Sequence, residues 1–220
     1  MTRNTSARVA GFTFLFYSVI GMCNELLTHR VMDATGEAAK LASIGQHATD
    51  VRLTLLIVVF ESFSALVLAV TLYGITRQHD MELATLGMAS RVAEGILGIL
   101  SIPAYLGLLW LAEAGPAAPD VATTNALRAF LLMPGPSVPL SAIFFSLGST
   151  VFSYLLLRGR IVPAAIGWLN VLSAGLLLVL LPIQLAGFST GSVSGFYQWV
   201  PALVSQTMLA LWLLTKGVAP

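Results

Sequence analysis

Charged residues are scarce in this sequence, and their scarcity sets the class of protein. Only 10% of the 220 residues are charged, whereas 57% are hydrophobic and the mean hydropathy is +0.87. A soluble domain carries about a quarter charged residues, so this chain cannot build a water-exposed surface. The apolar runs are long and continuous rather than alternating, which disfavours a transmembrane barrel. We therefore expect an all-α, polytopic membrane protein that forms a single helical domain over residues 1–220.

Cysteine, net charge and metal-binding patterns are also nearly absent. The single cysteine, Cys23, excludes an intrachain disulfide framework and a cysteine metal cluster. The net charge of +1 gives no basic footprint for nucleic acid. The chain has no HxxxH or HExxH pair, no phosphate-binding glycine loop and no diphosphate motif of the DxxD type. We therefore expect neither a metal nor another cofactor, and we disfavour nucleotide-driven pumps and soluble-type terpene synthases.

Six apolar stretches are long enough to cross a bilayer, which takes about 20 residues in a helix. They cover residues 9–27, 51–75, 84–112, 138–157, 162–187 and 196–215. The basic residues beside one set of span ends are Arg3, Arg8, Arg77, Arg158, Arg160 and Lys216, and those beside the other set are Arg30, Lys40, Arg52 and Arg128. The positive-inside rule then predicts that both termini are cytoplasmic.

Two connecting segments are longer than simple turns. Residues 33–50 interleave apolar residues with Glu37, Lys40 and His47, which predicts an amphipathic helix before the second span. Residues 123–133 begin with helix-capping residues, so we expect a short interfacial helix there. The prolines at 134–139 should then turn the chain back into the membrane. Both helices are predicted on the extracytoplasmic side, where they would cover the bundle. No internal repeat is visible, which argues mildly against an inverted-repeat transporter.

Four segments carry a resemblance to a known family. They are RVAG at 8–11, LYGITR at 72–77, LATLGMASRVAEG at 83–95 and SYLLLRGRIVPAAIGWL at 153–169. Together they resemble the bacterial membrane family catalogued as domain of unknown function 4386, from residue 8 to about residue 187. The resemblance implies six spans but no activity. We expect the protein to lie in the cell inner (plasma) membrane. Phe14 stands near the place where this family often has a tyrosine, and Tyr17 lies one turn further along.

Arg91 and Glu94 are two ionisable residues inside the third predicted span. Their spacing of three places both side chains on one face of a helix. A charged group in hydrocarbon costs a few kcal/mol, so we expect this face to point into the protein and the two groups to pair. Two interpretations stay open. The pair either pins the bundle, or it forms a site where Arg91 holds a polar head group and Glu94 acts as an acid.

Glu61 lies near the middle of the second predicted span, with no cation close to it in sequence. Arg91 is the only basic residue predicted deep inside a span, so two carboxyl groups compete for it. We expect the carboxyl that is left over, Glu61, to be neutral at pH 7, because hydrocarbon disfavours its charged form. A neutral buried carboxyl can donate a proton in catalysis, or it can simply hydrogen-bond to a neighbouring helix.

Further candidates for substrate contact come from polar and aromatic residues of the spans. They are Tyr17, Asn24, Glu25, Asn170, Phe60, Trp110 and Trp168. For Glu25 we favour an interfacial ion pair with Arg52 over a polar vestibule. Amides such as Asn170 more often join helices than bind ligands, and most aromatic residues in spans are core or interfacial anchors.

Two classes of function fit these residues. In the first, the protein is a membrane-embedded enzyme in which Glu61 protonates an isoprenoid or lipid, and Arg91 and Glu94 orient a polar end or hold a second proton. Aromatic walls would stabilise a developing carbocation, which is similar in kind to small multi-span terpene cyclases, although none of their motifs is present. In the second, the protein is a proton-coupled carrier, a channel or a sensor that uses the same carboxyl groups. The expected partners are an apolar small molecule or lipid and the bilayer, the oligomeric state is open, and a purely structural role stays possible.

Overall fold

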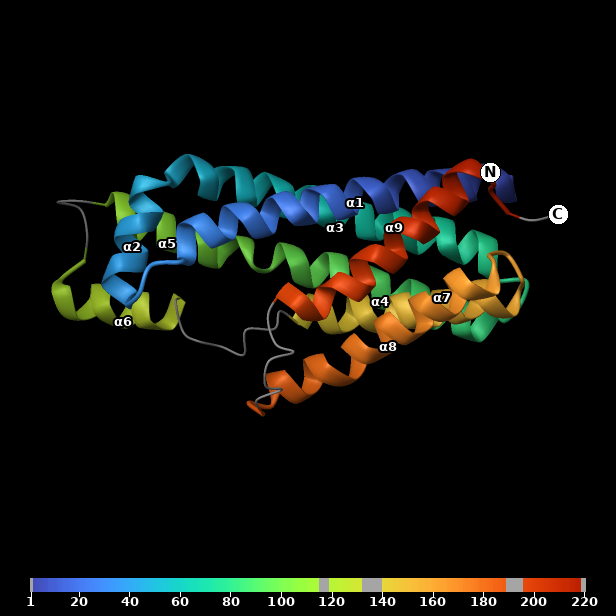
Figure 1. The fold of residues 1–220 in the computed structure, drawn as a ribbon. Helices are drawn as coiled ribbons and strands as arrows, with labels where there is room; N and C mark the ends of the chain where they lie inside the picture. The colour runs from blue at the N-terminus through green and yellow to red at the C-terminus, as the bar shows by residue number, and fades with distance from the viewer. Residues whose placement is uncertain (1, 115–118, 132–139, 189–195, 219–220) are drawn as a thin grey trace.

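The computed structural model describes residues 2–114, 119–131, 140–188 and 196–218, and all regular structure in these residues is helical (Figure 1). This confirms the predicted all-α class. The predicted proline turn at 134–139 and most of the predicted last loop, residues 189–195, lie outside the described residues.

Five helical segments are long and apolar enough to cross a membrane, which agrees with a multi-pass membrane protein. They are α1 (Arg3–Met32), α3 (Ala48–Thr76), the pair α4 (Met81–Ile99) and α5 (Ile102–Glu113), α7 (Leu140–Arg158) and α8 (Ala164–Leu185). The sixth predicted stretch contains a short 3-10 turn, η3 (Phe196–Trp199), and α9 (Val200–Thr215). Because α9 has only 16 residues, against the roughly 20 that cross a bilayer, the count of six spans stays a prediction.

The helices pack in chain order around a ring. α1 contacts α3, α3 contacts α4, α4 contacts α7, α7 contacts α8, and α9 contacts both α8 and α1. Both chain termini lie at one end of this bundle, which we name the terminal end, and we name the opposite end the distal end (Figure 1). This shared position is what an even number of spans requires.

The bundle has a step at its distal end. At 1.5 Å per residue, the 30 residues of α1 reach about 45 Å, whereas the 19 residues of α7 reach about 29 Å. α1, α3 and α5 therefore extend beyond α7, α8 and α9 on the distal side (Figure 1). Two short helices, α2 (Glu37–Gln46) and α6 (Val121–Leu131), pack against α5 there. Both fall where the sequence predicts extra helices, and their place at a membrane surface stays a prediction.

The third predicted span consists of two helices rather than one. Pro103 has no amide hydrogen for the carbonyl of Ile99, and its ring crowds that carbonyl, so the helix breaks just before it. The backbone nitrogen and the hydroxyl of Ser101 both donate to the Gly98 carbonyl, at 3.2 and 2.7 Å, which closes the end of α4. The break between α4 and α5 lies at the height along the bundle where α7, α8 and α9 end on the distal side (Figure 1).

An apolar core fills the half of the bundle nearer the terminal end. Its buried members come from α1, α3, α4, α7 and α9 and include Ala10, Phe14, Leu72, Phe152 and Leu213. Small residues let the helices approach closely. A Cβ atom on Gly11 would lie only 2.7 Å from the Ala210 carbonyl oxygen, so α1 and α9 can cross here only because residue 11 is glycine.

Candidate functional site

A cavity of about 410 Å³ lies between this core and the distal end. Its walls come from α1, α3, α4, the start of α5, the first turns of α7 and α9, and η3. The polar and aromatic residues in the lining include Tyr17, Asn24, Glu25, Glu61, Ser62, Glu94, Ser101, Tyr105, Phe145, Trp199 and Gln206. The cavity thus brings together groups that are up to 189 residues apart in the chain, from Tyr17 to Gln206.

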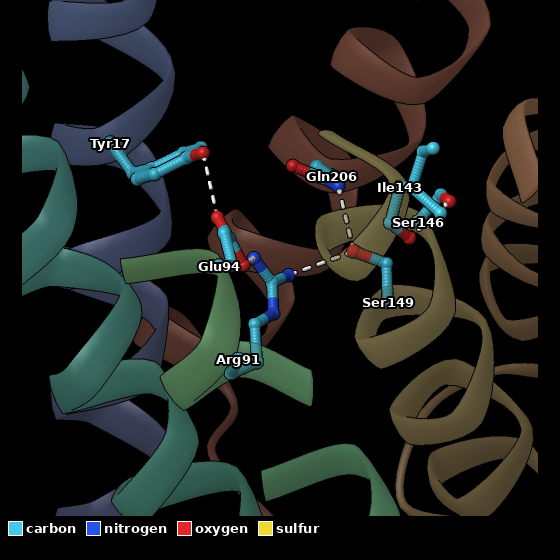
Figure 2. A network of polar contacts seen from close by, with 7 residues as sticks. All are labelled: Tyr17, Arg91, Glu94, Ile143, Ser146, Ser149 and Gln206. Atoms are coloured by element: carbon cyan, nitrogen blue, oxygen red, sulfur yellow. Dashed lines mark hydrogen bonds and ion pairs between the residues drawn. The ribbon is translucent and has the colours of Figure 1, made fainter. Parts of the chain in front are cut away.

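Glu94 is held on both of its carboxylate oxygens (Figure 2). Arg91 Nη1 donates to Glu94 Oε2 at 2.9 Å, and the Tyr17 hydroxyl donates to Glu94 Oε1 at 2.8 Å. Arg91 Nη2 donates to Ser149 Oγ at 2.8 Å, and Gln206 Nε2 reaches the same oxygen at 3.5 Å. One polar network therefore joins α1, α4, α7 and α9, and it contains the ion pair expected from the spacing of Arg91 and Glu94.

The Arg91 side chain is fully buried, with an exposed fraction of 0%. Its guanidinium carbon lies 4.8 Å from the centre of the Phe145 ring and 5.6 Å from that of Phe14, so two aromatic faces flank the charge. A Cβ atom on Gly148 would lie 3.1 Å from Arg91 Cγ, which shows how closely α7 covers this side chain. Arg91 does not line the cavity. It lies behind two lining residues, Glu94 and Phe145, and contacts both.

Glu61 lies on the same cavity but has a simpler environment. Asn24 Nδ2 donates to Glu61 Oε2 at 3.2 Å, and this is its only hydrogen bond within the described residues. The side chain is partly exposed to the cavity, whereas Glu94 is buried. On the facing helix α1, residue 21 is glycine, where a Cβ atom would lie 3.5 Å from Glu61 Oε1. The cavity therefore contains one carboxylate with hydrogen bonds to both oxygens and one carboxyl group with a described hydrogen bond to only one oxygen.

Three other predicted contact residues, Tyr17, Asn24 and Glu25, also line the cavity. The predicted pairing of Glu25 with Arg52 is wrong, because Arg52 Nη2 pairs instead with Glu113 Oε1 at 2.9 Å. The physical reason lies in α5, whose last residue, Glu113, lies beside the beginning of α3. Glu25 is left with its exposed side chain at the cavity margin.

The remaining predicted contacts lie away from the cavity. Phe60, Trp110 and Trp168 are about half exposed on the outside of the helices, where a bilayer would surround them. Asn170 is buried and donates to the carbonyl oxygens of Ile166 and Ser205, at 3.0 and 2.9 Å, so it joins α8 to α9. None of the four belongs to the cavity lining.

Ser149, Gln206 and Ser101 are not among the site candidates given by the sequence, which favours ordinary helix contacts for serines and glutamines in a span. Ser149 and Gln206 complete the Glu94 network, and Ser101 forms the cavity wall at the helix break. A serine or glutamine inside an apolar span has no local signature, since the same residue types also serve as ordinary helix contacts. Only the charged Arg91, which must find partners when buried, points to such groups on neighbouring helices.

Neither a metal site nor a serine nucleophile emerges from the described part of the chain. No three side chains of His, Cys, Asp and Glu within it are placed to hold a metal ion. The sequence does contain one G-x-S-x-G pentapeptide, at residues 187–191. The nucleophile elbow of serine hydrolases joins a strand to a helix, whereas this pentapeptide follows helix α8, and residues 189–191 lie outside the described residues.

Comparison with known proteins places the chain in a family without giving it an activity. No curated protein and no solved structure matches the sequence. A family model does match, and it covers residues 9–217, which is nearly the whole chain. The matched region contains every residue that lines the cavity, including those of α9 beyond the segments that carried the resemblance. The protein therefore belongs to the family described as domain of unknown function DUF4386.

Proposed function

We propose that the protein is an intramembrane enzyme in which Glu61 donates a proton to an apolar isoprenoid or lipid substrate. The observation that carries this proposal is the unequal environment of two carboxyl groups on one cavity. Glu94 is fixed by Arg91 and Tyr17, whereas Glu61 has only the Asn24 amide among the described residues. A carboxyl in a largely apolar cavity that no cation neutralises is suited to hold a proton and to deliver it.

The simplest reaction of this kind is the isomerisation of an alkene. The O–H bond of Glu61 breaks, a C–H bond forms on the substrate, and a carbocation develops on the neighbouring carbon. The cation then loses a proton from the next carbon to the Glu61 carboxylate, which restores the acid and leaves the double bond shifted. Ring closure before this last step gives a cyclisation. The rings of Tyr17 and Trp199 line the cavity and would stabilise the positive charge, together with the Glu61 carboxylate that forms when the proton leaves.

The position of the apolar core supports an enzyme over a carrier. A carrier or channel needs a path that reaches both sides of the membrane. The cavity is flanked on the terminal side by a buried cluster that includes Phe14, Leu72 and Phe152, with exposed fractions of 3% or less. A substrate would enter and leave by the distal side or from the bilayer. A proton-coupled carrier, channel or sensor stays the alternative, and it would require this core to open.

We also propose an inner-membrane location with both termini in the cytoplasm and the cavity on the extracytoplasmic side. The basic turn at the terminal end supports this orientation. Arg158 pairs there with Asp80 at 3.1 Å, while Asp80 caps α4 through a bond from the Leu83 nitrogen. Arg160 stays exposed beside it. A cysteine introduced at Gln78, which is exposed in the neighbouring turn at the terminal end, should therefore react with a membrane-impermeant thiol reagent only from the cytoplasmic side.

Turnover in heavy water tests the chemistry. The purified protein in nanodiscs is incubated in D₂O with a panel of isoprenoid polyenes and epoxides, and products are analysed by mass spectrometry. We expect an isomer of one panel member that carries one deuterium at the protonated carbon. Glu61→Gln should fold and yield no product, because an amide cannot deliver the proton. Glu82→Gln, an exposed acid in the first turn of α4, is the matched control. Full activity of Glu61→Gln would overturn the proposal.

A further inference from the structure

Several hydrogen-bond donors on the cavity wall already donate to acceptors of the protein, whereas several acceptors on the wall receive no hydrogen bond from the residues that the structure describes. The Tyr17 hydroxyl donates to Glu94, and Asn24 Nδ2 donates to Glu61. The hydroxyl of Ser62 donates to the Val58 carbonyl at 2.9 Å, and that of Ser101 donates to the Gly98 carbonyl at 2.7 Å. Each of these four lining residues therefore already donates to an acceptor of the protein itself.

Several acceptors, in contrast, have no donor within the described residues. Asn24 Oδ1 is buried without a partner. Gln206 has an exposed fraction of 6%. Its Nε2 contacts Ser149 Oγ, and its Oε1 receives no hydrogen bond from the described part of the chain. Glu61 Oε1 likewise lacks a described donor. Of these three, Asn24 Oδ1 is the one buried without a partner, and a buried acceptor is normally satisfied in a folded protein, so it indicates that a donor is supplied from outside the chain.

The ionisable residues of the lining also favour a ligand that donates hydrogen bonds. Glu25, Glu61 and Glu94 are its three ionisable acids, and the described lining contains no lysine, arginine or histidine. Arg91, the nearest cation in the network, is committed to Glu94 and Ser149 behind the wall. An anionic head group would find no cation in the described lining, whereas an ammonium group would find acceptor oxygens and acids that no lining cation pairs with.

We infer that this cavity is a binding site for a lipophilic organic cation, namely a protonated amine on an apolar body. The ammonium group supplies N–H donors to the oxygens of Glu61 and Asn24, and its charge favours the ionised form of Glu61, whose proton passes to solvent when the cation binds. The rings of Tyr105 and Trp199 also line the cavity and would provide aromatic contact for the cation and surface for the apolar body. A volume of about 410 Å³ suits a small molecule. Proton transfer by Glu61 is not needed for this binding, although the same walls would suit a cationic intermediate of the proposed reaction.

A series of four probes with one apolar body tests the inference. The probes are 6-phenylhexylamine, its N,N,N-trimethyl ammonium analogue, 6-phenylhexanol and 6-phenylhexanoate. Binding is measured at pH 7 by calorimetric titration of the protein in phosphatidylcholine nanodiscs, and titration of empty nanodiscs is subtracted to remove partitioning into lipid. We expect the amine to bind at least about tenfold more tightly than the alcohol, the carboxylate to show no saturable binding, and the trimethyl analogue to fall between amine and alcohol because it lacks N–H donors.

Two variants locate the effect. In Glu61→Gln the preference for amine over alcohol should fall to less than about threefold, whereas in Glu82→Gln it should be unchanged. Thermal unfolding of each variant checks that it is folded. Equal binding of the amine and the carboxylate by the parent protein would overturn the inference without any variant, and so would an amine preference that survives in folded Glu61→Gln. A variant that loses the preference for the amine but keeps turnover, or one that loses turnover but keeps the preference, would show that cation binding and the proposed catalysis are separate properties.

Discussion

Glu94 and Glu61 lie on neighbouring helices and face the same cavity, yet they have different neighbours. Glu94 takes part in a network that spans four helices, with Arg91 and Tyr17 on its two oxygens. Glu61 accepts one hydrogen bond from an amide of α1 and is partly exposed to the cavity. The two glutamates therefore differ in their contacts within one cavity. The Glu94 side joins four helices, whereas the Glu61 side joins only α3 to α1 within the described residues.

The acidic residues are unevenly distributed along the chain. All ten acidic residues occur in the first 120 residues, so α7, α8 and α9 contribute none. These three helices supply uncharged polar groups instead, such as Ser149 and Gln206, which support the charged groups of α4. The first half of the chain therefore provides the chemistry of the site, and the second half provides the neutral wall that positions it.

Removing Arg91 should have the largest effect on stability. Arg91→Ala leaves the Glu94 carboxylate buried without its cation, and breaking a buried pair costs roughly 3–5 kcal/mol of the free energy of unfolding. We expect a strongly lowered thermal unfolding temperature in detergent. The double change Arg91→Ala with Glu94→Ala should lose less than the sum of the two single changes. Strictly additive losses would show that the two residues do not act as a unit.

The sequence was sufficient to predict the helical membrane class and the Arg91–Glu94 pair, because hydropathy and helix spacing are local properties. The partners contributed by other helices were not predictable. Tyr17 and Ser149 are 77 and 58 residues away from the groups that they contact. The exposed Phe60 had no distinguishing signal either, since an aromatic residue in a span looks the same whether it faces lipid or a cavity. The Arg52–Glu113 pair depends on where α5 ends, which spacing in the sequence does not reveal.

Parallel amide substitutions should separate the two carboxyl groups directly. Glu94→Gln leaves Arg91 buried beside a neutral amide, so we expect a loss of about 2–4 kcal/mol in the free energy of unfolding. Glu61→Gln keeps the size of the side chain and can still bond to Asn24, so its loss should stay below about 1 kcal/mol. Both variants are compared by chemical unfolding in the same detergent. Equal losses would mean that the Glu61 side also holds the bundle together.

The Tyr17 hydroxyl offers a finer test of the Glu94 side. Tyr17→Phe removes one bond to a buried carboxylate and leaves the ring stacked on Phe145, where the centroids are 6.1 Å apart. We expect a loss of about 1–3 kcal/mol, the usual effect of removing one donor from a buried charged acceptor. Tyr105→Phe is the matched control, since Tyr105 lines the same cavity outside the Glu94 network. A smaller loss for Tyr17→Phe than for Tyr105→Phe would argue against the importance of this bond.

Asp120 provides the smallest effect and a water-exposed reference for the two buried carboxyls. It lies just before α6, where its Oδ2 accepts from the Thr123 hydroxyl and its Oδ1 accepts from the backbone nitrogens of Ala122 and Thr123, at 2.6, 3.0 and 3.0 Å. These bonds, the Thr123 hydroxyl first among them, lower the pKa of Asp120 below its ordinary value of 3.8. The pKa of Asp120 is lower in the folded state than in the unfolded state. The stabilisation of α6 by ionised Asp120 is therefore fully present above the ordinary pKa and is lost as the pH falls through the lowered pKa.

Amide hydrogen exchange at Ala122 and Thr123 should therefore be slow at pH 5 and accelerate, relative to the intrinsic rate, only below pH 3.8. Asp120→Asn should remove this pH dependence while preserving much of the protection, because asparagine caps helices without titrating. Amides of α7 in the same sample provide the internal control, since that helix contains no acid. Loss of protection that begins at a pH above 3.8 would contradict the lowered pKa and would assign the cap to another group. A cap of this kind acts only within one helical turn, in contrast to Glu94, whose bonds reach from α4 to α1 and, through Arg91, to α7.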